Sequence, residues 1–161
     1  VHNRQAGRWV FIMIICNEQD MKAFGARLIQ PGIAPGVITL KGNLGTGKTT
    51  LVRGALEACG ITTGVRSPTY TLVEYYPLKQ FSIAHFDLYR LGDPEELEYL
   101  GFRDYLRADT WCFIEWPERA EGYLGNIGLE IEIAYQNECR KLTAHAENPW
   151  GEQLRQAINL K

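Results

Sequence analysis

The sequence predicts one α/β domain, in which helices flank a mixed and mostly parallel sheet. Short apolar runs alternate along the chain with segments whose apolar residues recur at helical spacing. Interleaved strands and helices are typical of a sheet with parallel neighbours. A length of 161 residues suits a single domain, and 45% hydrophobic with 22% charged residues is ordinary for a globular protein. Because no repeat or linker divides the sequence, we expect residues 1–161 to form one domain.

The first half of the chain predicts two strands that are each followed by a helix. Asn17 is placed to cap the first helix, and Asp20 lies in its first turn. Gly60 is placed to end the second helix. The expected elements are a strand over residues 9–15, a helix from 17 to about 29, a strand over 37–41, and a helix after the glycine-rich segment that follows.

The second half predicts five strands and three helices. Asp93 begins the run Asp-Pro-Glu-Glu, in which an N-cap acid, a proline at the first helical position and a glutamate at the third favour a helix start. That helix is expected to end at Gly101. Strands are expected at about 70–76, 81–87, 111–115, 129–135 and 139–146, and further helices at about 103–108 and 150–158.

Residues 42–49 read G-N-L-G-T-G-K-T and match the phosphate-binding pattern G-x-x-x-x-G-K-[S/T] in full. They follow a predicted strand and open a predicted helix, which is the context that such a loop requires. Gly42, Gly45 and Gly47 can adopt positive φ, so backbone N–H groups can surround an anion at the positive end of the helix dipole. The alternative is a chance glycine turn. Because all eight positions match, we expect nucleotide binding.

Two side chains of this loop and two acids beyond it have the chemistry of a magnesium–nucleotide site. Lys48 supplies a cation for the β- and γ-phosphates, and the Thr49 hydroxyl can ligate Mg²⁺. Glu115 and Asp87 each end an apolar run, where a carboxylate can hold Mg²⁺ directly or through water. Either acid could instead face solvent or cap a turn. Beside a phosphate loop we favour the functional interpretation of both.

The nucleotide is expected to be ATP rather than GTP. The sequence has no [N/T]-K-x-D stretch to recognise guanine, and no D-x-x-G segment follows a strand. It also lacks the L-S-G-G-Q signature of transporter ATPases and the arginine-rich lid of nucleoside kinases.

Charge and cysteine content limit the partners and the location. A net charge of −2 provides no basic field for DNA, so any contact with RNA would need a partner or a local patch. The cysteines show no C-x-x-C or metal spacing, and we interpret them as free thiols of a cytoplasmic protein in a reducing compartment. They are Cys16, Cys59, Cys112 and Cys139.

The N-terminal apolar run is interpreted as a strand. Residues 9–15 are too few to span a bilayer, and no small-residue cleavage site follows them, so no membrane contact is expected. Because the chain opens with Val1, residues 1–12 are interpreted as a possible extra or non-native segment, with Met13 as one candidate start.

Four motifs follow one another along the chain: Gly42–Thr50, Ser67–Glu74, His85–Leu91 with Asp93–Leu97, and Ile114–Pro117. In this order and spacing they resemble the bacterial TsaE (YjeE) family. The resemblance covers about residues 16–135. It implies a magnesium-dependent ATPase that supports a partner complex of the TsaD and TsaB type. That complex forms threonylcarbamoyladenosine beside the anticodon of tRNAs that read ANN codons, so this chain would meet tRNA only indirectly.

The resemblance also implies roles for individual residues. Glu115 matches the Walker B acid, and Asp87 matches an acid near the γ-phosphate that could orient water. Thr69 resembles a γ-phosphate sensor, or else belongs to a turn that only starts a strand. Trp116 could stack on the nucleotide or a partner, or simply pack, and Glu18 could lie near the adenine. The loop contacts to the nucleotide are expected from Gly42, Asn43, Leu44, Gly45, Thr46, Gly47, Lys48, Thr49 and Thr50.

Three of these residues are expected to be catalytic, and three to hold the metal ion. The catalytic set is Lys48, Asp87 and Glu115, and the metal set is Thr49, Asp87 and Glu115. His85, on an otherwise apolar strand, is interpreted as a satisfied core histidine. Tyr89 and Arg90 could face a partner. No arginine finger is evident in the sequence, so slow turnover that a partner stimulates is expected. The alternatives are a small-molecule kinase and a nucleotide-gated adaptor that does not need hydrolysis.

Overall fold

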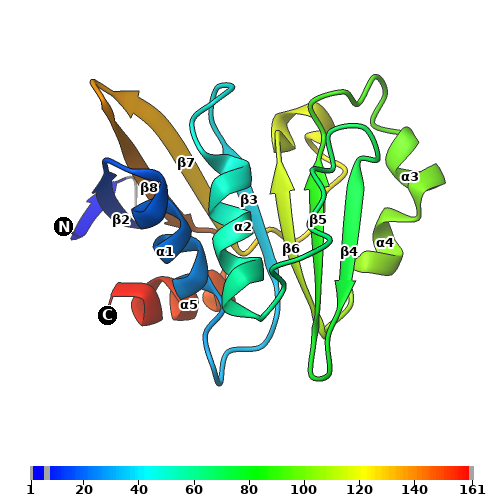
Figure 1. Cartoon of the computed structure of the whole chain (residues 1–161), viewed down its shortest axis with the longest axis horizontal. Helices are drawn as coiled ribbons and strands as arrows, with labels where there is room; N and C mark the ends of the chain where they lie inside the picture. Colours follow the sequence, from blue (N-terminus) through cyan, green and yellow to red (C-terminus); the bar gives the residue numbers. More distant parts are fainter. Residues whose placement is uncertain (1, 6–7, 160–161) are drawn as a thin grey trace.

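A computed structural model of the chain describes residues 2–5 and 8–159 and contains one eight-stranded sheet (Figure 1). The strands are β1 (His2–Gln5), β2 (Arg8–Ile15), β3 (Val37–Lys41), β4 (Val73–Pro77), β5 (Ser82–Asp87), β6 (Thr110–Glu115), β7 (Leu129–Gln136) and β8 (Cys139–Ala146). The helices are α1 (Glu18–Leu28), α2 (Lys48–Ala58), α3 (Glu96–Leu100), α4 (Phe102–Tyr105), the 3₁₀ turn η1 (Pro117–Ala120) and α5 (Pro149–Asn159).

The sheet is mixed, with its parallel pairs at the centre. The strand order is β1-β2-β8-β7-β3-β6-β5-β4. β3 runs parallel to β6 and β7, and β6 runs parallel to β5. The pairs on both flanks are antiparallel. The predicted α/β class, a mixed sheet flanked by helices, is confirmed.

The first helix begins where the sequence predicts. The Asn17 side chain accepts a hydrogen bond from the backbone N–H of Asp20 at 2.8 Å, which satisfies one of the free donors at the helix start. The strand β3 and the helix α2, which follows the glycine-rich segment, also lie where they were expected.

The start of β4 differs from the prediction. A strand was expected from about residue 70, but β4 begins at Val73. Leu72 has φ of 66°, and its N–H donates to the Pro68 carbonyl at 2.9 Å. Residues 68–72 therefore form a turn, and only the segment after it can pair with β5.

The helix predicted at Asp93 starts with a turn. The Asp93 side chain accepts the N–H of Glu95 at 2.9 Å, and Glu96 accepts the N–H of Asp93 at 3.1 Å. The Glu96 contact is one half of a capping box, whereas the Asp93 side chain accepts from two residues on and so forms an Asx turn. The regular helix then runs from Glu96 to Leu100, and Gly101, with φ of 75°, ends it as predicted. The next helix, α4, is shorter than expected and ends at Tyr105.

Each face of the sheet packs against its own hydrophobic core. On one face α1, α2 and α5 cover residues such as Leu40, Phe113 and Ile131. On the other face α3, α4 and η1 cover residues such as Phe86 and Ile114. Because residues alternate between faces along β5 and β6, both strands are buried on both sides, as expected for central parallel strands.

Two glycines allow α1 and α2 to approach closely. A Cβ at Gly25 would lie 1.8 Å from the Leu51 carbonyl oxygen, and a Cβ at Gly54 would lie 2.1 Å from the Lys22 carbonyl oxygen. Any larger residue would push the helices apart. This contact therefore fixes the position of α2, and with it the glycine-rich loop at its start.

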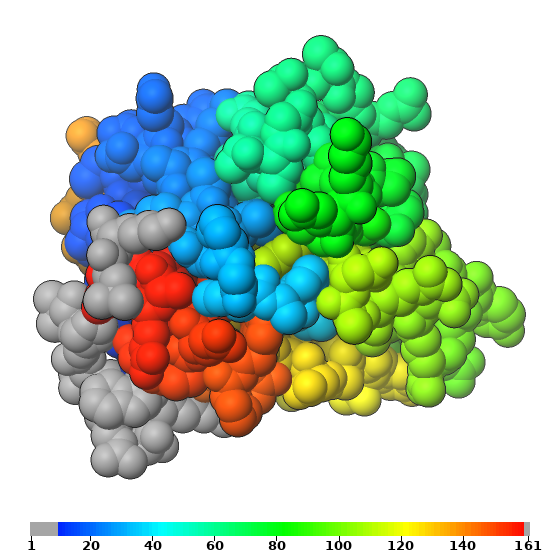
Figure 2. Space-filling model, turned by 90° about the horizontal axis from the view of Figure 1, so that it is seen from below, coloured from blue at the N-terminus to red at the C-terminus, as the bar shows by residue number. Residues whose placement is uncertain are grey.

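Different segments lie at the two ends of the central strands. The carboxyl ends of β3, β5 and β6 meet at one edge, at the top of Figure 1, where the loop from β3 to α2 lies. This is the edge at which α/β sheets bind ligands. Figure 2 shows the opposite edge, where residues 29–36 lie beside α5. There Trp150 Nε1 donates to the Ala34 carbonyl at 2.7 Å.

The prediction of four free cysteines is wrong for two of them. Cys16 and Cys139 form a disulfide, and their Cα atoms are 4.1 Å apart. The antiparallel register of β2 and β8 pairs Ile15 with Arg140, so the next residues face each other. Nothing in a separation of 123 residues indicates this contact. Cys59 and Cys112 are free.

The N-terminal segment contributes to the sheet where it is described. Residues 1, 6 and 7 of the segment 1–12 lie outside the described residues. Val10 and Phe11 are buried, and they pair with His145 and Ala144 of β8. Across residues 2–5 and 8–159, no helix has the length and apolar character needed to cross a bilayer.

The disulfide can be tested by thiol counting. When the protein is denatured without reductant, iodoacetamide should label two of the four cysteines, and after reduction it should label all four, as read by intact mass. Cys139→Ser should lower the free energy of unfolding by about 2–4 kcal/mol in oxidising buffer, because the cross-link restricts the unfolded chain. Cys59→Ser is the matched control. Four labelled thiols without reductant would contradict the pairing.

Candidate functional site

The loop between β3 and α2 has the backbone of an anion cradle. Gly42, Gly45 and Gly47 have φ values of 156°, 78° and 111°. A Cβ at Gly42 would lie 2.6 Å from the Ile133 carbonyl oxygen, so the loop cannot sit here with a larger residue. The first amide groups of α2 have no intrahelical acceptor and open toward this loop. The cradle thus follows from glycine at fixed positions.

The β7–β8 hairpin braces the loop from the side. The Tyr135 hydroxyl donates to the Leu44 carbonyl at 2.6 Å. The Arg140 guanidinium lies 4.4 Å from the centre of the Tyr135 ring. Sequence reasoning missed both residues, because they lie about a hundred positions after the loop and belong to no local motif. Leu44 itself is exposed at the mouth of the site.

Lys48 is held inside the loop by neutral partners. Its ammonium group donates to the carbonyls of Gly42 and Asn43, the latter at 2.9 Å, and lies 4.4 Å from the centre of the Trp116 ring. Burial lowers the pKa of the Lys48 amine, while Glu115, Asp87 and Glu118 act in the opposite direction. The cation is therefore partly desolvated and lies beside the cradle that an anion would fill.

Glu115 and Asp87 lie side by side at the ends of β6 and β5, where they are register partners. Both are almost fully buried. The Thr49 hydroxyl lies 3.0 Å from each oxygen of Glu115, and His85 Nε2 lies 2.5 Å from Oε2. The Glu115 carboxylate is thus held between α2 and β5.

Asp87 is less well compensated than its neighbour. Its Oδ1 accepts the N–H of Tyr89 at 3.0 Å. Burial raises the pKa of the Asp87 carboxyl, and repulsion from Glu115 adds to this, while the Tyr89 N–H, His85 and Lys48 lower it. The ionised form of Asp87 therefore carries a net cost in this fold.

His85 is a core histidine, as the sequence indicates, but its partner is a residue of the site. Its side chain is 3% exposed and contacts the Walker B candidate Glu115. One signal could have found it. Residues two apart on a strand share a face, so His85 must point to the same side as Asp87.

Trp116 follows β6 in a left-handed conformation, with φ of 58°. Its ring packs against Tyr89, with ring centres 4.9 Å apart, and against the Lys48 ammonium. Left-handed backbone is rare for an aromatic residue and is found where the surroundings impose it. Here it turns the indole over the loop instead of away from it.

One cavity of about 420 Å³ gathers most of the predicted residues. It lies between the glycine loop and the ends of β5 and β6. Among its lining residues are Leu44, Gly45, Gly47, Lys48, Thr49, Thr50, Thr69, Asp87, Tyr89, Arg90, Glu115 and Trp116. Positions scattered over more than seventy residues thus meet in one place.

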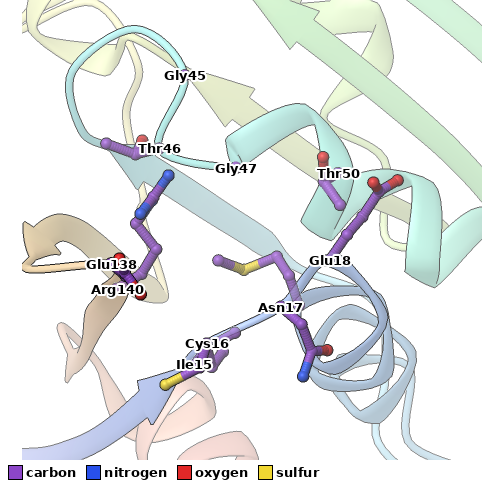
Figure 3. A pocket seen from close by; sticks show the side chains of 11 residues that line it. Ile15, Cys16, Asn17, Glu18, Gly45, Thr46, Gly47, Thr50, Glu138 and Arg140 are labelled. Carbon is purple, nitrogen blue, oxygen red and sulfur yellow. The ribbon is translucent and has the colours of Figure 1, made fainter.

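A second cavity, of about 270 Å³, lies on the other side of the loop (Figure 3). Glu18 lines this cavity, together with Gly45, Thr46, Gly47 and Thr50. Figure 3 shows Arg140 extending toward the glycine loop from β8, opposite the start of α1. Glu18 therefore lies near the loop but apart from the two acids.

The Ser-Pro-Thr segment lies at the rim of the larger cavity. The hydroxyls of Ser67 and Thr69 are 2.7 Å apart, and Thr69 is half-buried. Tyr70 beside it is 82% exposed, with the Arg90 guanidinium 4.5 Å from its ring centre. The segment does start a turn, but it also brings Thr69 to the cavity.

The donor set suits Mg²⁺ bound to a nucleotide. Thr49 offers a hydroxyl, and Glu115 and Asp87 offer carboxylates, which are the hard oxygen ligands that Mg²⁺ prefers. In the described part of the chain, no group of three or more His, Cys, Asp and Glu side chains could hold a metal ion. A Mg²⁺ ion here would complete its octahedron with phosphate and water oxygens.

The chain is similar to known proteins over most of its length. The family described as threonylcarbamoyl adenosine biosynthesis protein TsaE matches residues 15–142. A TsaE of Haemophilus influenzae is 45% identical over 123 residues, which are 76% of this chain and 78% of that protein. A TsaE of Bacillus subtilis is 39% identical over 118 residues, 73% of each chain. The crystal structure of Bacillus subtilis YdiB superimposes with a TM-score of 0.77 at 27% identity, covering 95% of this chain and 96% of that one.

The cost of burying Asp87 predicts a pH-dependent stability. Because the pKa of Asp87 is raised in the folded state, its protonated carboxyl favours folding relative to its ionised form. This stabilisation is fully present below the pKa of the unfolded state and is lost as pH rises through the pKa of the folded state. Asp87→Asn should therefore raise the melting temperature at pH 7 by a few degrees, and the gain should shrink toward pH 4. The exposed Asp104→Asn is the control. A less stable Asp87→Asn protein, or a difference independent of pH, would contradict this account.

Proposed function

The chain belongs to the TsaE family, and from that premise we propose that it is a magnesium-dependent ATPase of tRNA threonylcarbamoyladenosine biosynthesis. We propose that it binds and hydrolyses ATP in support of a partner complex of the TsaD and TsaB type. That complex would form threonylcarbamoyladenosine next to the anticodon of tRNAs that read ANN codons. A role in tRNA modification implies a cytoplasmic location, where the Cys16–Cys139 bond would meet cellular reductants.

The observation that carries the proposal is the convergence of four side chains on one cavity. Lys48 and Thr49 come from the start of α2, and Asp87 and Glu115 come from the ends of two central strands. A cation, a hydroxyl and two carboxylates beside a glycine cradle match the parts that phosphoryl transfer requires.

Each residue has a proposed task with ATP bound. The loop amides and the N-terminus of α2 would bind the phosphates, and Lys48 would exchange the carbonyls of Gly42 and Asn43 for phosphate oxygens. Thr49 and Glu115 would hold Mg²⁺, which supplies charge neutralisation on the β- and γ-phosphates. Asp87 would orient the attacking water through Oδ2, since Oδ1 accepts the Tyr89 N–H. The adenine base would occupy the second cavity, which Glu18 lines together with Gly45 and Gly47.

The rim of the cavity has the properties of a partner surface. Leu44 and Tyr70 are exposed there at 60% and 82%, next to Arg90 and Tyr89. Exposed aromatic and arginine side chains are enriched at protein interfaces. We propose that the TsaD-type or TsaB-type partner contacts this rim and responds to whether Thr69 contacts the γ-phosphate. Hydrolysis would then be slow until the partner binds.

The proposal predicts that turnover depends on the cation and on the acid. Lys48→Ala and Glu115→Ala should each lower phosphate release by about 10²–10³-fold, because they remove charge stabilisation of the transition state. Both should fail to support tRNA modification with the purified partners. The exposed Lys79→Ala, in the turn between β4 and β5, is the matched control.

The same assays separate the alternatives. Ordinary hydrolysis by both mutants would refute the site. A small-molecule kinase would transfer the phosphate of labelled ATP to a metabolite instead of water. A nucleotide-gated adaptor would restore tRNA modification with a nonhydrolysable ATP analogue.

A second prediction concerns coupling to the partner. Thr69→Ala should lower partner-stimulated hydrolysis about tenfold and change ATP affinity by less than about twofold. Ser67→Ala is the matched control, because it removes the same hydroxyl–hydroxyl contact but leaves the hydroxyl that lines the cavity. Equal losses of affinity and stimulation, or equal effects of the two variants, would count against a switch.

A further inference from the structure

Two side chains contact the Glu115 carboxylate, and they differ in whether they contact one of its oxygens or both. The Thr49 hydroxyl lies 3.0 Å from both oxygens and therefore does not distinguish them. His85 Nε2 lies 2.5 Å from Oε2 alone. Of these contacts, the one from His85 therefore distinguishes the two oxygens.

We propose that His85 is a positioning residue that orients the Glu115 carboxylate for Mg²⁺. By donating from Nε2 to Oε2, it would leave Oε1 as the oxygen available to a metal ion beside Thr49. The inference rests on the proposed function, since it assigns a task only if Glu115 serves a magnesium nucleotide. His85 would not touch the nucleotide, the metal or the reacting atoms.

Burial makes this contact strong and rigid. Both side chains are 3% exposed, so water cannot replace the histidine as a donor. A hydrogen bond to an ionised acceptor in such surroundings is about twice as strong as a neutral one. The contact needs a hydrogen on Nε2, which the neutral Nε2–H tautomer supplies. Partners of this kind orient metal ligands, and their loss typically weakens metal affinity by about 10–100-fold.

The sheet determines the position of the His85 imidazole ring. His85 lies on β5 opposite Phe113 of β6, and every residue of both strands is buried. Two residues later on each strand, Asp87 faces Glu115. The ring therefore lies two residues before the two acids along these strands. From there it can reach Glu115 but cannot enter the cavity.

The Thr49 contact does not make the histidine redundant. When a threonine oxygen ligates a metal, its single hydrogen can still be donated to a carboxylate. That hydrogen can go to either oxygen of Glu115, because both are equally distant. His85 removes this freedom.

Two substitutions separate positioning from packing. His85→Leu fills the core but has no donor, whereas His85→Gln places an amide N–H close to the position of Nε2. Thr39→Val is the control, because Thr39 is a fully buried polar residue of β3, on the other side of β6, and its hydroxyl makes no hydrogen bond. For each protein, ATP dissociation constants are measured with excess Mg²⁺ and with EDTA, and Mn²⁺ affinity is measured in the presence of ADP.

The expected result is specific to the metal. His85→Leu should lose about tenfold or more of the affinity gained from Mg²⁺, with a matching loss of Mn²⁺ affinity and an unchanged constant in EDTA. His85→Gln should recover most of this loss, and Thr39→Val should behave as the wild type. In nitrogen-15 spectra, the Nε2–H signal of His85 should shift in Glu115→Gln and not in Lys79→Ala.

Several results would overturn the inference. Unchanged metal dependence in His85→Leu would do so, and so would equal losses with and without metal. If His85→Gln bound the metal no more tightly than His85→Leu, the role of His85 would be limited to core packing. The same would follow if the Nε2–H signal of His85 did not shift in Glu115→Gln. A wild-type protein whose ATP affinity does not depend on Mg²⁺ would instead refute the proposed function, and the inference with it.

Discussion

Four ionisable side chains share a small buried volume at the carboxyl edge of the sheet, and the rest of the structure serves to hold them there. Lys48, His85, Asp87 and Glu115 are each at most 6% exposed. Burying one such group alone would be costly, so each must find compensation from the others or from backbone dipoles. Glu115 is compensated by His85 and Thr49, and Lys48 by two carbonyls. The set persists because the groups are buried together.

This arrangement requires the elements around it to be placed within narrow limits. Parallel pairing of β3, β5 and β6 brings their carboxyl ends to one edge, which puts the glycine loop beside both acids. The close contact of α1 and α2 at Gly25 and Gly54 then fixes the helix that carries Lys48 and Thr49. The local chemistry of the loop and the global packing of the sheet therefore depend on each other.

The far side of the loop is built from the chain's two distant ends. The β7–β8 hairpin contacts the loop through Tyr135, and the Cys16–Cys139 bond joins β8 to the start of α1. These contacts close the second cavity against Glu18. The glycine cradle is formed by residues that are adjacent in sequence. The opposite wall of the second cavity depends on contacts between distant segments.

Several features follow from the sequence alone because their causes are local. Glycines at fixed spacing before a helix determine the phosphate cradle, Asn17 determines where α1 begins, and Gly101 determines where α3 ends. The search for strand-end acids beside such a loop selected Asp87 and Glu115, which line one cavity in the structure, and the order of motifs identified the family. These inferences need only backbone preferences and residue chemistry within a few positions.

The remaining features depend on contacts between distant segments. Strand register decides that His85 reaches Glu115, that Tyr135 braces Leu44, and that Cys16 meets Cys139. The left-handed turn at Trp116 that brings its ring over Lys48 is likewise imposed by packing. Register and packing depend on the whole sheet, and no local pattern encodes them. The sequence therefore determined which polar and ionisable groups this protein carries, and the tertiary structure decided which of them lie in contact.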